Sequence, residues 1–96
     1  MFFHQVWLKV REGVDEAEMA ALLADIRALA ATIPGVVSIH AGRNVTDRAQ
    51  GYTHAVSVVL AGRDALEPYL EHPAHVAVGA RIRDRCEVMA ADFEDG

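Results

Sequence analysis

The sequence predicts an α+β domain in which a four-stranded antiparallel sheet carries helices on one face. Segments with the two-residue alternation of strands and segments with the three- and four-residue spacing of helices follow one another in the order βαββαβ. The 96 residues suit a single domain, residues 1–96, without repeat or linker. Hydrophobic residues make up 52% of the chain, which excludes a disordered protein.

The first half of the chain predicts a strand, a helix and a second strand. The strand covers Phe2–Val10, and large side chains occupy both of its faces: His4, Val6, Leu8 and Val10 on one, Phe3, Gln5, Trp7 and Lys9 on the other. Asp15 with Glu18 resembles a capping box, and the helix that follows ends at Pro34-Gly35. The second strand is expected over Val36–Ala41.

The second half predicts a loop, a strand, a broken helix and a last strand. In chain order, these elements are a loop over Gly42–Gly51, a strand over Tyr52–Leu60, a short helix over Arg63–Leu70, a helix from Pro73 to about Ala80, a strand over Arg85–Phe93 and a frayed end from Glu94. Pro68 is tolerated only near a turn or distortion of the short helix. This order is the split-βαβ, ferredoxin-like pattern.

The predicted helices cover only one face of the sheet, although apolar side chains lie on both. Phe3, Trp7, Val36 and Val59 are assigned to the uncovered face. The simplest cover is the same face of a second copy, because two-fold homodimers are the commonest oligomers. We therefore expect a homodimer whose two sheets form a dimeric α+β barrel.

Composition also limits the partners and the compartment. The net charge is -5 and no basic run occurs, so nucleic acids and anionic membranes are not expected partners. No apolar stretch reaches the roughly 18–20 residues of a membrane span. The N-terminus lacks the features of a signal peptide, and Cys86 is the single cysteine. We expect a cytoplasmic protein.

Two histidines lie on the inward face of the central strands. His4 and His54 alternate with Val and Leu, and neighbouring strands could direct both imidazoles into one space toward the helices. The alternative is that each is a hydrogen-bonded core residue without a chemical role. His40, on the opposite parity from His4, is assigned to the surface or an interface.

A second group of chemically capable residues surrounds the break in the second helix. His75 lies near a helix N-terminus, which disfavours the imidazolium, so it is a candidate general base. Tyr69 could bring a phenol to the same pocket, or be only a buried aromatic. His72 is an N-cap candidate for the helix that Pro73 begins, and together with His75 it could also bind a metal.

Several motifs resemble the stress-responsive α/β-barrel (Dabb) family across the whole chain. They are His4 in the first strand, Ile33-Pro34-Gly35, Gly42-Arg43-Asn44, Gly51-Tyr52-Thr53-His54, Tyr69-Leu70-Glu71-His72-Pro73-Ala74-His75-Val76 and Asp92-Phe93. The Tyr-x-x-His-Pro-x-His block is the most specific. The resemblance implies a ferredoxin-like monomer and a barrel-forming homodimer.

Similarity to the polyketide cyclases of this family implies a function. These enzymes close a poly-β-keto thioester by aldol chemistry without cofactor or metal, and the resemblance assigns the base to His75 and the orienting donor to Tyr69. The substrate, a small hydrophobic or aromatic molecule, would contact His4, His54, Val6, Leu8, Val56, Leu23, Ile26 and His72. Leu22, Leu23 and Ile26 replace aromatic residues of the cyclases, and a tryptophan is missing near Cys86, so the pocket should differ in shape. The alternatives are a non-catalytic, stress-responsive barrel dimer that binds small molecules, a metal site, and a cofactor-independent oxygenase of the wider barrel superfamily.

Overall fold

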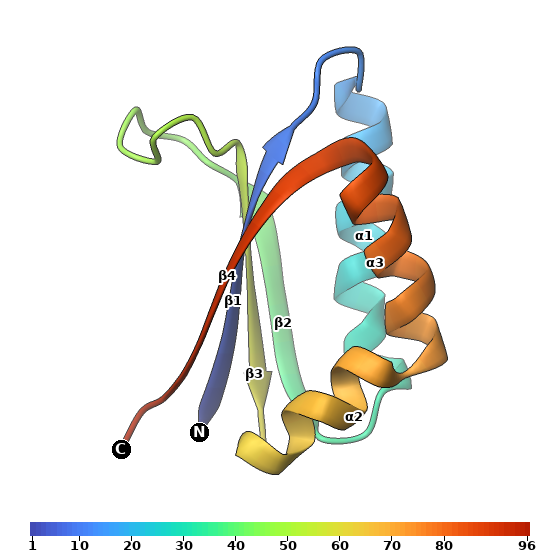
Figure 1. Ribbon diagram of the computed structural model, residues 1–96, viewed down its shortest axis with the longest axis vertical. Helices are drawn as coiled ribbons and strands as arrows, with labels where there is room; N and C mark the ends of the chain where they lie inside the picture. Colours follow the sequence, from blue (N-terminus) through green and yellow to red (C-terminus); the bar gives the residue numbers. More distant parts are fainter.

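The computed structural model describes all 96 residues and places the helices on one side of a single sheet (Figure 1). The elements are β1 (Phe2–Val10), α1 (Glu16–Thr32), β2 (Val36–Arg43), β3 (His54–Leu60), the 3-10 turn η1 (Arg63–Ala65), α2 (Leu66–Glu71), α3 (Pro73–Arg85) and β4 (Cys86–Glu94). The strands run antiparallel in the order β2-β3-β1-β4. The predicted ferredoxin-like architecture is therefore confirmed.

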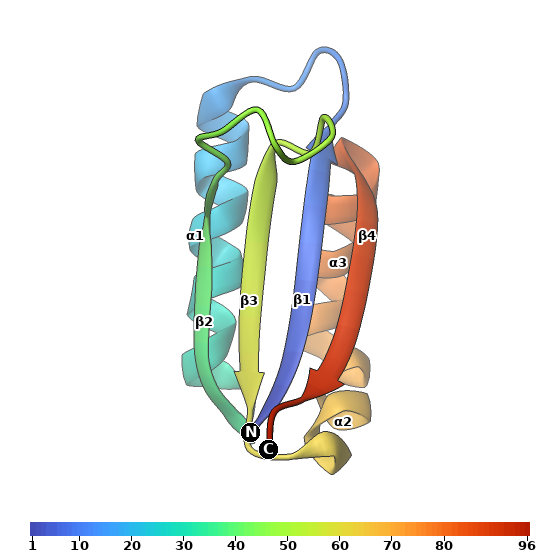
Figure 2. The same ribbon diagram turned by 90° about the vertical axis from the view of Figure 1, so that its left-hand side faces the viewer.

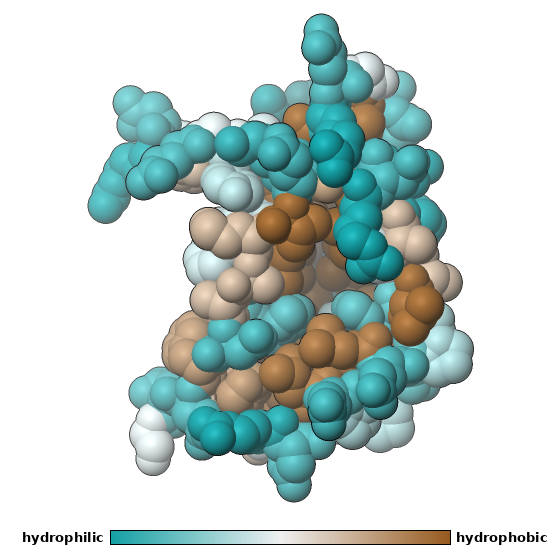
Figure 3. All heavy atoms as spheres, viewed as in Figure 1, coloured by the Kyte–Doolittle hydropathy of each residue, from teal (hydrophilic) through white to brown (hydrophobic).

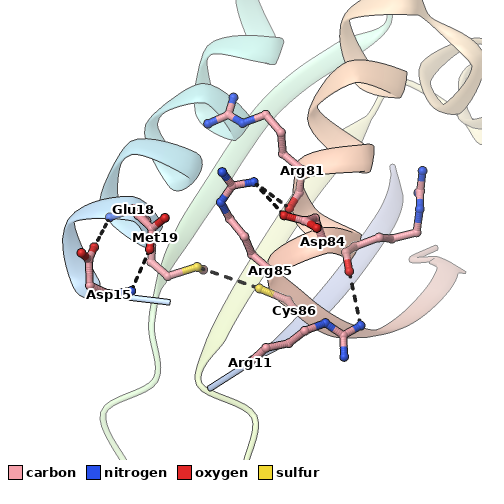
Figure 4. A network of polar contacts seen from close by, with 9 residues as sticks. Arg11, Asp15, Glu18, Met19, Arg81, Asp84, Arg85 and Cys86 are labelled. Carbon is pink, nitrogen blue, oxygen red and sulfur yellow. Dashed lines mark hydrogen bonds and ion pairs between the residues drawn. The ribbon is translucent and has the colours of Figure 1, made fainter. Parts of the chain in front are cut away.

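Helix α1 begins and ends where the sequence predicts. The Glu18 amide donates to Asp15 Oδ1 over 2.8 Å, and the Asp15 amide donates to Glu18 Oε2 over 3.0 Å, which completes the capping box (Figure 4). At the other end, Gly35 has a φ of 86°, and a Cβ at this position would lie 3.1 Å from the Cβ of Ala65. Glycine is therefore required there for both conformation and space.

Two short helical segments and the longer α3 replace the second helix of the pattern. Pro68 lies in the first turn of α2, where its missing N–H costs no hydrogen bond. His72 ends α2 and caps α3, with its Nδ1 accepting from the Ala74 amide over 3.1 Å. The N-cap interpretation of His72 is thus confirmed.

The C-terminal half of α3 is longer than predicted, since it continues past Ala80 to Arg85. Its last turns carry arginines, which interact favourably with the carbonyl end of a helix. Arg81 pairs with Asp25 of α1 over 2.7 Å. The Arg85 guanidinium donates to the Arg81 carbonyl over 3.4 Å (Figure 4). These contacts stabilise the helix beyond Ala80, where the sequence predicted its end.

The core lies between the sheet and α1. Fifteen apolar residues form it: Phe2, Leu8, Met19, Leu22, Leu23, Ile26, Leu29, Ile33, Ile39, Val56, Val58, Leu60, Tyr69, Val78 and Cys86. Leu8, Leu22 and Leu60 are fully buried, and each such side chain contributes about 1.5–3 kcal/mol through its removal from water. The predicted inward face of β1 is confirmed.

The prediction that Val36 lies on the outer face of the sheet is wrong. A β-bulge interrupts the pairing of β2 with β3, so that Val36 lies opposite Leu60 while Ser38 lies opposite Val59. The extra residue reverses the alternation at that point, because strand side chains repeat every two residues. Val36 therefore packs against the core, and Val37 is 53% exposed.

No helix covers the outer face of the sheet, and the loop between β2 and β3 lies over one end of it (Figure 2). Phe3 and Phe93 stack on this face with ring centroids 5.2 Å apart. Met89 and Phe93 remain about half exposed, while Trp7 is partly buried. No helix of the chain is long and apolar enough to cross a lipid bilayer.

The two ends of the chain meet at one end of the sheet (Figure 2). Strands β1 and β4 pair over their whole length, from Phe2 opposite Glu94 to Val10 opposite Cys86. The Asp95 amide then donates to the Met1 carbonyl over 3.2 Å. The first and last residues are thus hydrogen-bonded neighbours.

Candidate functional site

The break between α2 and α3 brings Tyr69 and His75 together. Their ring centroids lie 4.6 Å apart with the planes tilted by 51°. Tyr69 is 2% exposed and belongs to the core, whereas His75 is half-buried. The pair that the sequence predicted is therefore in contact, with one member reachable from outside.

A backbone hydrogen bond determines which nitrogen of His75 is free. Its Nδ1 lies 3.0 Å from the Leu70 carbonyl, which can only accept, so Nδ1 carries the proton and donates. In the neutral ring, Nε2 then keeps its lone pair. Burial lowers the pKa of His75, the hydrogen bond to Leu70 opposes this, and His4 and Arg83 lower the pKa further. The imidazole is therefore mostly neutral at pH 7, and its Nε2 can accept a proton.

Tyr69 remains protonated under the same conditions. Burial raises the pKa of its phenol to about 12. No fully buried side-chain oxygen or nitrogen lacks a hydrogen-bond partner, and this hydroxyl has no partner within the chain, so its oxygen reaches accessible space. Tyr69 is thus suited to donate a hydrogen bond to a ligand rather than to act as a base.

His4 contacts Tyr69 on one side and the carboxylate of Asp92 on the other. The His4 ring lies 5.8 Å from the Tyr69 ring in an edge-on arrangement, and His4 Nδ1 lies 2.5 Å from Asp92 Oδ1. The sequence indicated Asp92 only through the family resemblance and did not predict it as a site residue. The register of β1 with β4 would have predicted the contact, because it places Asp92 directly opposite His4 on the inward face.

His54 does not share a space with His4, which corrects the expectation from the sequence. In the register of β1 with β3, His4 lies opposite Val58 and His54 opposite Leu8. The two histidines are on the same face, but four residues of strand separate them, or about 13 Å at ~3.3 Å per residue. The alternation of the strands predicted the correct face for both histidines. The antiparallel register places them at different positions along the strands.

The tautomer of His54 follows from its neighbour Thr53. The Thr53 hydroxyl donates to the Leu8 carbonyl over 3.1 Å and accepts from the Val10 amide over 3.1 Å. With its single proton used, the hydroxyl can only accept from His54 Nδ1, which lies 2.8 Å away. Burial and the nearby Arg43 lower the pKa of His54, against a smaller opposing effect of Glu16, so this imidazole is also neutral with Nε2 free.

His54 borders a pocket of about 610 Å³ at the loop end of the sheet. Apolar side chains of β1 and α1 line its floor: Val10, Val14, Met19, Ala20 and Leu23. Polar groups around it include Tyr52, Asn44 and Arg43, with Asp15, Glu16 and Asp47. The lining carries three carboxylates against one guanidinium, which favours neutral or cationic ligands.

The remaining predicted contact residues have different surroundings. Leu8, Val56 and Ile26 are at most 4% exposed and pack in the core. Val6 is partly buried beside them, and Leu23 lines the pocket near His54. His72 uses its Nδ1 to cap α3. No three or more His, Cys, Asp or Glu side chains are arranged to hold a metal ion.

A hollow between the sheet and the helices opens beside β4. Hydrophobic residues line it in the space-filling view (Figure 3). Val88 of β4 points to the same side of the sheet as Leu8, with which it pairs, yet it is 44% exposed. The helices therefore leave the inner side of β4 partly uncovered at Val88.

The sequence profile of the stress-responsive A/B barrel domain (Dabb) matches residues 2–95. The chain belongs to the Dabb family. It is similar to an uncharacterised protein of Streptomyces coelicolor, with 35% identity over 98% of this chain and 99% of that protein. It is also similar to olivetolic acid cyclase of Cannabis sativa, with 31% identity over 90% of this chain and 87% of the cyclase.

Solved structures match this Dabb chain along its whole length. The structure of At3g17210 from Arabidopsis thaliana has a TM-score of 0.92 at 23% identity and covers 100% of this chain and 96% of that one. Hydroxynitrile lyase from Passiflora edulis reaches 0.91 at 16% identity, covering 99% and 93%. A Thermobifida fusca protein described as dimeric and ferredoxin-like reaches 0.86 at 24%, covering 98% and 90%. At these identities, the structures show a shared fold.

Proposed function

We propose that this Dabb protein is a cofactor-free enzyme that catalyses intramolecular aldol or other enolate chemistry on a poly-β-keto substrate, with His75 as general base and Tyr69 as hydrogen-bond donor. The observation that carries this proposal is the pairing of a neutral histidine, whose Nε2 is free, with a protonated phenol 4.6 Å away between ring centroids. Similarity to olivetolic acid cyclase supports the reaction class.

The chemistry needs only the groups of this site. His75 Nε2 removes a proton from a carbon between two carbonyls, which leaves an enolate. The enolate carbon then attacks a carbonyl carbon of the same chain, so that a C–C bond forms and the carbonyl oxygen becomes an alkoxide. The imidazolium returns its proton to that oxygen, and loss of water completes the ring. Tyr69 stabilises the negatively charged oxygen by donating a hydrogen bond.

His4 and Asp92 support this arrangement from the strand side. The Asp92 carboxylate accepts from His4 Nδ1–H, which orients the His4 ring against the edge of Tyr69. His4 therefore helps to fix the phenol and presents its own Nε2 near the reacting groups. We assign His4 to substrate contact, as the sequence predicted.

We further propose that the protein acts as a cytoplasmic homodimer through the outer face of its sheet. Phe3, Trp7, Met89 and Phe93 give this face an apolar surface that no helix of the chain covers. The solved structures described as dimeric share the fold. A second copy placed face to face would remove these side chains from water and form the barrel.

The test compares two variants on a linear poly-β-keto thioester, with formation of the cyclised aromatic product measured by chromatography. His75→Gln should lower turnover at least 100-fold, since general base catalysis contributes about 10²–10⁴-fold. Arg48→Gln changes an exposed residue of the loop between β2 and β3 and should leave turnover unchanged. Equal turnover of the two variants would reject His75 as the base.

A second function, non-catalytic binding of a small molecule, is favoured by the position of the pocket at His54. The pocket of about 610 Å³ lies at the loop end, away from Tyr69 and His75. If binding there is the function, Leu23→Trp should fill the pocket floor and abolish ligand binding, while His75→Gln should have no effect on it. The reverse pattern supports the enzyme.

A further inference from the structure

A stripe of three residues runs along one side of α3, each one helical turn after the last. His75, Gly79 and Arg83 are spaced at four-residue intervals, which places them one above another on a helix. A Cβ added to Gly79 would lie 3.7 Å from His75 Cε1 and 3.4 Å from Arg83 Nη1. The guanidinium is therefore folded back over the glycine toward the imidazole.

Gly79 lies between the imidazole and the guanidinium and places no side-chain atom there. It is buried in the middle of α3, where glycine destabilises a helix relative to alanine, and its φ is not in the left-handed region. A methyl group at this position would be in van der Waals contact with both the imidazole and the guanidinium. The glycine therefore keeps the space between these two side chains free of protein atoms, beside Cε1, the ring atom next to the free Nε2.

Arg83 differs from the other arginines of α3 in having no carboxylate partner. Arg81 pairs with Asp25 over 2.7 Å, and Arg85 lies 3.7 Å from Asp84. The side chain of Arg83 takes part in no ion pair. The hydrogen bond that Arg11 donates to this residue, over 3.3 Å, goes to its backbone carbonyl. In a chain of net charge -5, an unpaired guanidinium beside a histidine is available for an anion from outside.

We propose that Arg83 binds the carboxylate of a small carboxylic acid ligand and holds it over Gly79, next to His75. The planar guanidinium matches a carboxylate with two parallel hydrogen bonds. The inference rests on the proposed function and deepens it, because it uses the same histidine and specifies a ligand with a free carboxylate. That ligand is a β-keto acid in place of the thioester, or the aromatic acid that remains once water has cleaved the thioester and the thiol has left. It also predicts preference for an acid over the corresponding neutral amide.

Benzoate and benzamide provide a matched pair of probes, equal in shape and different in charge. Each is titrated into the protein while the His75 Cε1–H signal is followed by NMR, which yields dissociation constants without any turnover. Benzoate should bind at least ten times more tightly than benzamide and shift the His75 signal. Arg83→Gln should abolish this preference, and Arg83→Lys should retain part of it.

Two further variants separate recognition from folding. Arg48→Gln makes the same charge change in an exposed loop and should leave the preference for benzoate intact. Gly79→Ala should raise the dissociation constant of both probes at an unchanged or higher Tm, because alanine favours the helix while its methyl group fills the space. Loss of binding with retained Tm would locate the ligand over the glycine.

Three results would overturn the proposal: equal affinity for the two probes, a benzoate preference that survives Arg83→Gln, or no His75 shift with saturating benzoate. The outcome is independent of the proposed reaction. A benzoate preference without turnover would reject the cyclase and leave the carboxylate site standing. Turnover that depends on His75 without a benzoate preference would reject only the role of Arg83.

Discussion

The ring of Tyr69 contacts the ring of His75 although the two residues belong to different helices. His72 and Pro73 create the relationship, since one ends α2 and caps α3 while the other starts α3 in a new direction. A continuous helix would place residues six apart on different faces, at 100° per residue. The helix break is therefore what assembles the candidate site.

Tyr69→Phe should lower turnover of the poly-β-keto thioester by about 10²–10³-fold, the usual effect of removing one donor to a developing oxyanion. The ring would still fill the core, and the lost hydroxyl has no partner within the chain, so the Tm should change little. Steady-state kinetics and thermal unfolding measure the two effects. A variant that unfolds more easily but turns over normally would show that Tyr69 is structural only.

The stability of the fold should decrease as the pH falls below 6.5, the ordinary pKa of histidine. The pKa values of His75 and His54 are lowered in the folded state, so between the folded and unfolded values the unfolded chain binds more protons. The contribution of these residues is therefore complete above pH 6.5 and is lost as the pH falls through their folded pKa values. Urea unfolding of the protein and of His75→Gln from pH 5 to pH 8 should show a smaller pH dependence in the variant; identical slopes would contradict this.

Turnover should change little between pH 7.5 and pH 9 and decrease at lower pH. His75 is the proposed base, and because its pKa is lowered from 6.5 the ring is largely neutral in that range, while Tyr69, with a pKa of about 12, stays protonated. A pH–rate profile under saturating substrate measures this. A rate that rises tenfold per pH unit across the range would exclude a neutral His75 as the base.

Trp7→Asp should convert the proposed dimer to a monomer. The substitution places a carboxylate on the outer face of the central strand β1, where a facing copy would have to bury it without a partner. Val45→Asp is the matched control, since Val45 is 91% exposed on a loop. Light scattering measures the mass of both variants, and a stable Trp7→Asp dimer would move the interface elsewhere.

Asp92→Asn should reduce the free energy of unfolding by about 1 kcal/mol, because an amide accepts a hydrogen bond less strongly than a carboxylate does and Asp92 is partly exposed. Asp95→Asn, at the exposed end of the chain, should have no effect. Urea titrations compare the two. Equal stability would mean that the contact with His4 contributes nothing to the fold.

Local patterns in the sequence were sufficient for the order of elements and most faces. The alternation of β1, the capping box at Asp15 and the cap at His72 all depend on residues close together in the chain, and all are confirmed. Val36 was assigned to the wrong face because a bulge depends on the partner strand and leaves no mark in the alternation. The continuation of α3 to Arg85 likewise depends on contacts with α1.

For the candidate site, local sequence was informative about Tyr69 and His75, which are near neighbours in the chain. It was misleading about His4 and His54, whose heights along the sheet follow from a register between distant strands. Asp92 was missed as a site residue for the same reason, since its partner His4 is at the other end of the sequence. The role of Gly79 depends on an empty volume, which no motif describes.

The hydrogen bond between Asp95 and Met1 makes the chain nearly a closed ring. A short Gly/Ser linker could join the two ends across this gap, and new ends could be opened in the exposed loop around Asp47. Such a circular permutant would begin with β3 and end with β2. It would keep every strand pairing of the sheet, although the order of synthesis has changed.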